Sequence, residues 1–218
     1  MKTEQYNITN EDNMLLMARY EDNHFDLAIV DPPYGINRDG HNGVNAKKAE
    51  HNWKKYDFKG WDNERPTKEY WEELFRVSKK QVVFGANYFT EYLPPSMGWI
   101  VWDKGQRLTM SDGELIFTSE NKALRIHTIN RCEAREEGMI HPTQKPTKIY
   151  KIILEKLTNE GDLILDTHLG SGSIAIALNN MNKLDKMNLH LTACELDKDY
   201  FEASCKRIEQ QTRQQTIF

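Results

Sequence analysis

Long apolar runs are absent from this chain of 218 residues, and its opening residues, Met1 to Tyr6, are polar. A bilayer-spanning helix needs about 20 apolar residues, and a secretory signal needs an apolar core. Cysteine is also scarce: Cys132, Cys194 and Cys205 are the whole set, and none stands in a CxxC spacing. We therefore expect a cytoplasmic protein that makes no contact with a membrane, keeps its thiols reduced and holds no metal.

The sequence lacks an internal repeat and a convincing linker, so its length predicts one α/β domain over residues 1–218. The net charge of −4 argues mildly against indiscriminate binding of nucleic acid. Between Arg38 and Lys68, however, eight Lys and Arg residues stand against five Asp and Glu residues, interspersed with His and aromatic side chains. This mixture suits a phosphate backbone and unstacked bases, and it suits an ordinary solvated loop equally well.

Short apolar segments alternate with amphipathic ones along the chain, which is the pattern of an α/β fold. Strands are expected at 6–9, 25–30, 81–84, 99–102, 115–117, 124–126, 162–166 and 189–194, with the fifth and sixth paired as a hairpin. Helices are expected near 14–20, 67–77, 87–92, 146–157, 173–181 and 197–210. Residues 35–65 show no clear period, so we predict a flexible insertion there, and 131–138 is expected to be an exposed loop.

The stretch Asp31-Pro32-Pro33-Tyr34 follows the strand expected at 25–30. Neither proline can donate a backbone hydrogen bond and both have a fixed φ, so the strand ends in a rigid corner. Ligands of open α/β sheets bind at this carboxyl end of the strands. The Asp31 carboxylate and the proline carbonyls can accept N–H groups, and Tyr34 offers a ring for stacking. Together they suit a planar ring with an exocyclic NH₂ group, although a structural turn beside a helix-capping Asp has the same sequence.

A glycine-rich turn follows the strand expected at 162–166, and a helix and a further strand come after it. Gly170 and Gly172 permit a tight turn, and Glu195 at the end of the next strand can accept hydrogen bonds from both hydroxyls of a ribose. This βαβ layout is typical of nucleotide binding, and its spacing leaves a nicotinamide or flavin cofactor open. Asp166, directly before the turn, favours a ligand with an ammonium group, such as S-adenosylmethionine. A purely structural turn is the alternative.

These two motifs, in this order, resemble those of the β group of amino-methyltransferases, which modify adenine N6 or cytosine N4 in DNA. Residues 31–34 are similar to the catalytic motif of that group, and residues 166–173 resemble its cofactor loop, Asp-x-Phe-x-Gly-Ser-Gly-Thr. Residues 141–146 resemble a segment that precedes the loop, and Asp12 stands where members often place an Asp against the adenine of the cofactor. The resemblance implies an S-adenosylmethionine-dependent methyltransferase with a Rossmann-like fold. That fold is a seven-stranded, mostly parallel sheet with one antiparallel strand and helices on both faces.

The resemblance also implies roles for individual residues. The catalytic group comprises Asp31, Pro32, Pro33 and Tyr34. The cofactor-binding group comprises Asp12, Thr143, Lys145, Asp166, His168, Gly170, Ser171, Gly172 and Glu195. His168 replaces the usual Phe of the loop, and an imidazole there would make cofactor affinity depend on pH.

An Asp at the first position of the catalytic motif favours adenine, because cytosine enzymes of the resembled family more often have Ser there. The expected reaction is therefore transfer of a methyl group from S-adenosylmethionine to the N6 amino group of adenine in DNA, after the base is flipped out. Cytosine N4, an RNA adenine and a protein glutamine amide are alternative acceptors for the same chemistry. A catalytically silent nucleic-acid-binding protein with this fold, and a dehydrogenase, are alternatives of another class.

DNA is the expected partner, with RNA as the alternative. A homodimer and a cognate restriction endonuclease, in a prokaryotic or phage-infected cell, are left open. The chain is short, and residues 104–138 leave room for a small target-recognition segment only. Strong sequence specificity is therefore not expected.

Overall fold

The computed structural model describes residues 1–38, 58–106, 111–130 and 132–213, with the backbone alone at 134 and 135. The elements are, in chain order, β1 (Tyr6–Thr9), α1 (Asn13–Met17), β2 (Leu27–Val30), α2 (Lys68–Val77), β3 (Gln81–Phe84), the 3₁₀ turn η2 (Ala86–Tyr88), β4 (Trp99–Asp103), β5 (Gly113–Thr118), β6 (Arg125–Thr128), α3 (Cys132–Glu136), α4 (Thr147–Leu157), β7 (Leu163–Asp166), α5 (Ser173–Leu184), β8 (His190–Cys194) and α6 (Lys198–Arg213).

The strands of the described residues form one sheet in the order β1-β8-β7-β2-β3-β5-β4-β6. Every neighbouring pair is parallel except those of β5, which runs antiparallel to both β3 and β4. The predicted mostly parallel sheet with one antiparallel strand is therefore confirmed. Its predicted number of seven strands is wrong, because both short edge strands join the sheet: β1 pairs with β8 and β6 pairs with β4.

The hairpin expected between 115–117 and 124–126 does not form. Phe117 of β5 faces Val83 of β3 on one side and Trp99 of β4 on the other, so both edges of β5 are already filled. The chain crosses over instead, and β6 takes the free edge of β4 in the parallel direction. Residues 131–138 also differ from the expected loop, because 132–136 form the short helix α3.

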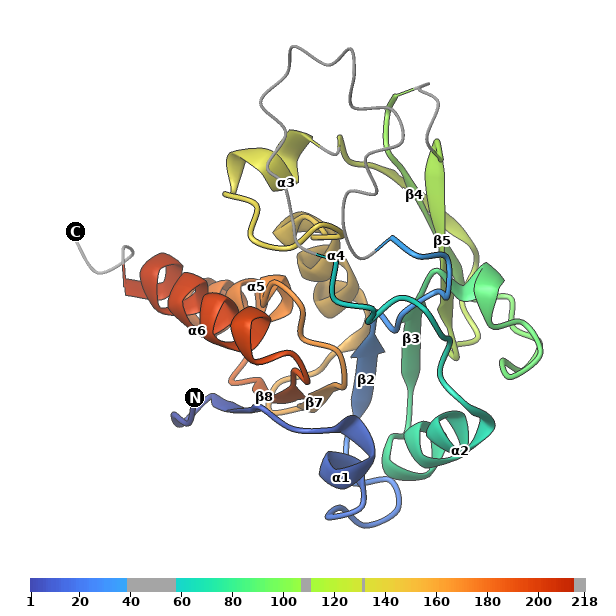
Figure 1. Ribbon diagram of the computed structural model, residues 1–218, viewed down its shortest axis with the longest axis horizontal. Coiled ribbons are helices and arrows are strands. Elements are labelled where there is room, and N and C mark those ends of the chain that lie inside the picture. The colour runs from blue at the N-terminus through green and yellow to red at the C-terminus, as the bar shows by residue number, and fades with distance from the viewer. Residues whose placement is uncertain (39–57, 107–110, 131, 214–218) are drawn as a thin grey trace.

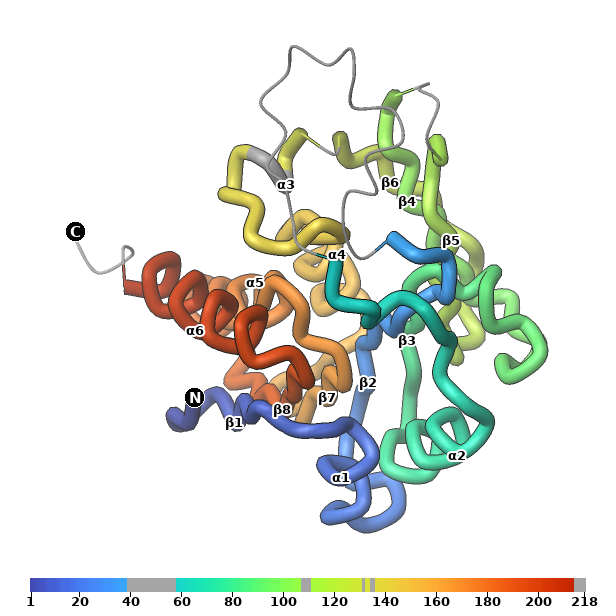
Figure 2. The backbone as a smooth tube through the Cα atoms, viewed as in Figure 1, coloured from blue at the N-terminus to red at the C-terminus, as the bar shows by residue number. Residues whose placement is uncertain are grey.

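Helices cover both faces of the sheet (Figures 1 and 2). On one face, apolar residues of α4, α5 and α6 pack on the sheet, among them Ile153, Leu178 and Ile208. On the other face, Leu16 of α1 and Trp71 of α2 pack in a second core layer together with Phe89, and Trp71 is the largest buried side chain of that layer. The large aromatic side chains of the described residues thus belong mostly to the core. The described helices are all too short or too polar to span a bilayer.

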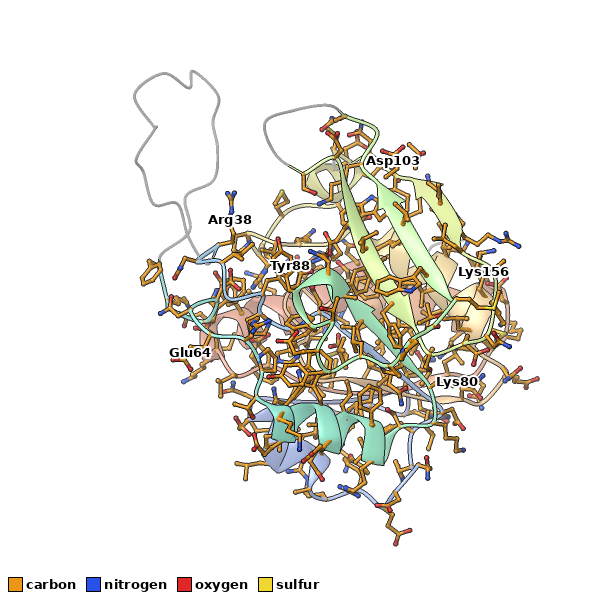
Figure 3. All side chains as sticks on the ribbon, turned by 90° about the vertical axis from the view of Figure 1, so that its right-hand side faces the viewer. Arg38, Glu64, Lys80, Tyr88, Asp103 and Lys156 are labelled. Atoms are coloured by element: carbon orange, nitrogen blue, oxygen red, sulfur yellow. The ribbon has the colours of Figure 1, made fainter. Side chains whose placement is uncertain are left out.

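The sheet has a topological switch point between β7 and β2, where the crossover connections lead to opposite edges of the sheet. From β2 the chain passes through α2 to β3 on one side, and from β7 it passes through α5 to β8 on the other. Ala28 of β2 lies beside Leu165 of β7, so the carboxyl ends of these strands are neighbours. Figure 3 shows Asp103 at this end of the sheet and Lys80 at the opposite end. Such a switch point is where open α/β sheets bind ligands.

The insertion predicted at 35–65 is described only at its two ends. Residues 39–57 lie outside the described residues, and the prediction of flexibility there stays a prediction. The two ends are bonded to each other, because the Asn37 N–H donates to the Asp62 carbonyl, and Lys59 forms ion pairs with Asp197 and Asp199 at the start of α6. β5 and β6, two strands of the main sheet, occupy much of the segment 104–138.

Candidate active site

The Asp-Pro-Pro-Tyr corner, residues 31–34, begins where β2 ends, because the two prolines have no N–H to continue the ladder. Tyr34 turns back over the sheet edge, and its hydroxyl lies 2.7 Å from Oδ1 of Asp31. The ring has room there because residue 85, at φ +59°, is glycine: a Cβ at that position would overlap the Tyr34 ring. The Tyr88 ring stacks on Tyr34 with 4.8 Å between centroids and 14° between planes. The corner therefore holds a carboxylate beside an aromatic face.

The backbone of the corner is fixed by one buried carboxylate, that of Asp62, which is 2% exposed. Oδ1 of Asp62 accepts the N–H groups of Tyr34 and Gly35 at 2.7 and 2.9 Å, and its Oδ2 accepts that of Arg38 at 2.7 Å. Three N–H groups on one carboxylate bind strongly because the acceptor is charged. Asp62 thus positions the corner without belonging to it, and no spacing in the sequence signalled this role.

Asp31 lies in a cluster with a second carboxylate, that of Glu114, and two lysines. Nζ of Lys145, which is 5% exposed, lies 2.6 Å from Oδ2 of Asp31 and 3.3 Å from Oε1 of Glu114. Nζ of Lys104 lies 3.3 Å from Oε2 of Glu114, and that same Glu114 accepts at Oε1 from the Tyr34 hydroxyl at 2.8 Å. The corner is therefore part of a compact charged cluster.

Lys145 was predicted to lie beside the cofactor, and in the structure its ammonium group pairs with the carboxylate of Asp31. Its contact with a cofactor stays a prediction. Its carbonyl accepts the Ser173 hydroxyl at the start of α5, so this residue ties the corner to the glycine turn. Glu114 and Lys104 were not foreseen. Both stand at the ends of expected strands, but only the antiparallel direction of β5 brings the start of that strand to the same sheet edge.

The carboxyl groups of this cluster have opposite pKa shifts. Burial raises the pKa of Asp31, Lys145 opposes the rise and the Glu114 charge adds to it, so that the net shift is upward. Burial would also raise the pKa of Glu114, but Lys145 and Lys104 outweigh it and the pKa is lowered. The pKa of Lys145 is raised, because its two carboxylate neighbours outweigh its own burial.

The cofactor loop carries a buried carboxylate without a cation. Asp166 is 1% exposed, and its Oδ1 accepts the backbone N–H of His168 at 3.0 Å. No cation pairs with it among the described residues, and burial raises the pKa of Asp166 to about 8, with the charges of Asp31 and Glu195 adding to the rise. A buried carboxylate in this position fits a ligand that brings an ammonium group.

The glycine turn is closed by Glu195 at the end of β8. Its Oε2 accepts the Gly170 N–H at 2.9 Å and its Oε1 accepts the Asp197 N–H at 3.0 Å, which leaves lone pairs on both oxygens for hydroxyl donors. Gly172 has a φ of +73° and packs on Ile208 so closely that a Cβ would come within 2.8 Å of Ile208 Cδ1. The residues present thus fit the amine and the ribose of S-adenosylmethionine.

The other predicted cofactor residues make contacts within the protein. Burial lowers the pKa of His168 to about 3, and its ring nitrogens lie 3.0 Å from Asn13 Nδ2 and 2.9 Å from Thr167 Oγ1. This shift favours the neutral imidazole. The expected pH dependence of cofactor affinity through this residue stays a prediction. Asp12 caps α1 by accepting the Met14 N–H at 2.8 Å. Its contact with a cofactor stays a prediction.

Thr143 and Ser171 likewise bond to near neighbours. Oγ1 of Thr143 lies 3.1 Å from Nδ1 of His141, and Oγ of Ser171 lies 3.0 Å from that of Ser173. Both residues flank the place where Lys145 meets the turn, and their contact with a cofactor also stays a prediction. Among the described residues, no group of three His, Cys, Asp or Glu side chains is arranged to hold a metal ion. The three cysteines are unpaired.

Comparison with known proteins decides between the alternatives. A family model described as DNA methylase matches residues 90–206, more than half of the chain. The chain belongs to this DNA methylase family. The matched region holds the cofactor loop and Glu195, while the Asp-Pro-Pro-Tyr corner lies before it.

Relatives of the methylase agree with this assignment. It is 24% identical to the type II methyltransferase M.HpaI of Haemophilus parainfluenzae over an alignment 240 positions long, which covers 88% of this chain and 71% of the relative. Among solved structures, the complex of M1.HpyAVI with SAM has a TM-score of 0.58 at 17% identity and covers 93% of this chain and 98% of that one. The cytosine-N4-specific PvuII DNA methyltransferase has a TM-score of 0.61 at 13% identity and covers 97% and 92%.

These findings confirm the prediction of an S-adenosylmethionine-dependent DNA methyltransferase with a Rossmann-like fold. They exclude the dehydrogenase. They leave the base open, because the same fold carries cytosine-N4 specificity in the PvuII enzyme.

Proposed function

We propose that this methylase transfers a methyl group from S-adenosylmethionine to the exocyclic N6 amino group of an adenine in DNA, after that base has left the duplex. The observation that carries the proposal is the placement of two carboxylates. Asp31 follows β2 and Asp166 ends β7, and these neighbouring strands lie at the switch point of the sheet. One carboxylate is thus available to the amino group that accepts the methyl and the other to the cofactor.

On the cofactor side, the bound S-adenosylmethionine supplies an electrophilic methyl group on a sulfonium. Asp166 pairs with its ammonium group, and the free lone pairs of Glu195 accept its ribose hydroxyls. Gly170 and Gly172 let the backbone approach the ligand closely. The further contacts fall to Asp12, Thr143, Lys145, His168 and Ser171, which the family resemblance assigns to this side.

On the substrate side, Asp31 and the Pro32 carbonyl accept the two hydrogens of the amino group. The nitrogen lone pair is then aimed at the methyl group instead of being conjugated with the ring, and positioning carries most of the rate. The bound cofactor would supply the methyl group, with the electrons of the S–CH₃ bond staying on sulfur, and Asp31 would accept the amino proton. Tyr34 is proposed to stack on the base, and the parallel Tyr88 ring already covers one face of the Tyr34 ring.

The base leaves the duplex because its amino group is otherwise paired and stacked, and flipping exposes it. Adenine is proposed because Asp heads the catalytic motif. Cytosine N4 is the second candidate, and the likeness to the PvuII enzyme favours it. A homodimer and a cognate restriction endonuclease are further proposals, which light scattering of the purified protein and a cleavage-protection assay test.

Substitution of the catalytic carboxylate tests the assignment of the site. Asp31→Ala is expected to abolish methyl transfer to DNA while cofactor affinity, measured by calorimetry, stays within about threefold of the parent protein, because Asp31 contacts the base and not the cofactor. Glu64→Gln, on an exposed side chain of the neighbouring segment, is the matched control. Normal turnover by Asp31→Ala would refute the assignment, and loss of cofactor binding would move Asp31 to the cofactor side.

A further inference from the structure

The Tyr34 hydroxyl lies between two carboxyl groups. Its oxygen is 2.7 Å from Asp31 Oδ1 and 2.8 Å from Glu114 Oε1, both hydrogen-bond distances. A phenol has a single proton, so it can donate to only one of these oxygens at a time. The second short contact requires that the other carboxyl group carry a proton and donate it to the phenol oxygen.

Two arrangements of hydrogens satisfy this geometry. In one, the Asp31 carboxyl donates to the Tyr34 oxygen and the Tyr34 hydroxyl donates to an ionised Glu114. In the other, Glu114 is the acid and Asp31 is ionised. The two differ by a shift of two protons along two hydrogen bonds, with no change in the number of protons or in total charge. Lys145 lies against both carboxyl groups, so its ammonium group is next to the ionised carboxylate in either arrangement.

The surroundings of the pair favour the first arrangement when no substrate is bound. The groups that face Glu114 are Tyr34 and Asp31 after β2, Lys104 after β4, Lys145 before α4 and Tyr150 within α4. Asp31 also faces Asp166. The second ammonium, that of Lys104, is 3.3 Å from Glu114 and thereby stabilises the charge on that member of the pair. Accordingly, the pKa of Glu114 is lowered and that of Asp31 is raised.

We propose that Glu114 is a positioning residue for methyl transfer, which shares one proton with Asp31 through the Tyr34 hydroxyl and so sets the charge on Asp31. The proposal rests on the proposed function, in which Asp31 must be ionised to accept the amino hydrogens of the base. When the amino group enters, its N–H donors stabilise the Asp31 carboxylate, and the proton moves from Asp31 to Tyr34 while the Tyr34 proton moves to Glu114. The site thus keeps its catalytic carboxylate neutral until a substrate amino group is present.

Glu114→Gln removes the second carboxylate and keeps its shape. The amide can still donate to the Tyr34 oxygen, and Asp31 no longer competes with a like charge for Lys145. In single-turnover methyl transfer to duplex DNA at saturating cofactor between pH 5 and 9, the acid limb of the rate profile reports protonation of Asp31. This limb is expected to move to lower pH by about one unit or more in the variant. Glu120→Gln, just beyond the other end of β5, is the matched control and should leave the limb in place.

Tyr34→Phe keeps the ring and removes the hydroxyl that donates to the ionised Asp31. Its acid limb is expected to move to higher pH, opposite to the shift in Glu114→Gln. If Glu114→Gln does not fold, as judged by its thermal melting curve, this second variant decides the matter by itself. A uniform fall in rate at every pH, with the limb unmoved in both variants, would overturn the shared proton and leave Glu114 as a structural support.

Failure of the proposal can be told apart from failure of the proposed function. A parent protein that binds cofactor but methylates no DNA would refute the function. The proton can then still be followed in the free protein through the ¹³C resonances of its carboxyl groups. A carboxyl titration that Glu114→Gln shifts to lower pH supports the shared proton, and an Asp31 titration that this substitution leaves unchanged contradicts it.

Discussion

A single glycine gives the Tyr34 ring its place at the sheet edge. Gly85 has a φ of +59°, and a Cβ there would overlap the ring. Gly85→Ala is therefore expected to displace Tyr34 and to reduce methyl transfer by at least tenfold. Gly161→Ala is the matched control, since φ is +83° there and nothing lies within 4 Å of the added carbon. Both variants should lose about 1–2 kcal/mol in denaturant unfolding for the left-handed backbone. Equal activity in the two would contradict the packing described for Tyr34.

We expect Asp166 to make cofactor binding depend on pH. Its raised pKa of about 8 means that the carboxyl group is largely protonated at neutral pH in the free protein. The ammonium group of the cofactor stabilises the ionised form, so binding below pH 8 releases a proton and affinity rises from pH 6 to pH 8. Titration calorimetry at pH 7 in buffers of different ionisation enthalpy measures that release. Asp166→Asn should bind more weakly and release no proton, and proton release that persists in this variant would assign it to another group.

At the scale of elements, the segment that follows residue 57 determines the shape of the catalytic corner. Asp62 accepts three backbone N–H groups from residues 34–38. The amide of an Asn at this position has a single acceptor oxygen. Its NH₂ group would stand where the second carboxylate oxygen of Asp62 now accepts a backbone N–H group. Asp62→Asn is therefore expected to lower stability by about 1.5–3 kcal/mol, as for hydrogen bonds to a charged group. It should also raise KM for DNA, because the corner is no longer held.

The control for this substitution is the exposed neighbour Glu64, whose change to Gln should alter neither quantity. Urea unfolding measures the stability, and initial rates over a range of DNA concentrations give KM. A variant Asp62→Asn that matches the control in both measurements would show that the corner holds its shape without this carboxylate.

Local signals were enough to predict most elements. The helix expected near 14–20 is α1, which Asp12 caps, and the strand expected at 81–84 is β3, which Gly85 follows. The partner of each strand was harder to predict. A short connection between two apolar segments favours a hairpin, but whether β5 can accept β6 depends on what already fills its two edges. That is a property of the assembled sheet, and no window of a few residues contains it.

At the scale of the whole molecule, the two motifs come together because of the strand order. Residues 31–34 and 166–172 are far apart in sequence, yet β2 and β7 are neighbours in the sheet. The family resemblance was sufficient to predict that these two motifs belong to one site. It did not predict the cluster around Asp31, because Glu114 reaches the site through the antiparallel β5 and Lys145 through a side chain that crosses from the segment before α4. Such long-range contacts between charged groups leave no pattern in sequence spacing.

The measurement that tests the central claim most directly is identification of the methylated base. The purified protein is incubated with unmethylated genomic DNA and S-adenosylmethionine that carries an isotope-labelled methyl group. The DNA is digested to nucleosides, and mass spectrometry identifies the labelled one, with Asp31→Ala as the paired control. We predict labelled N6-methyladenine from the parent protein and none from the variant. Labelled N4-methylcytosine, or DNA without label from a protein that binds the cofactor, would contradict the claim.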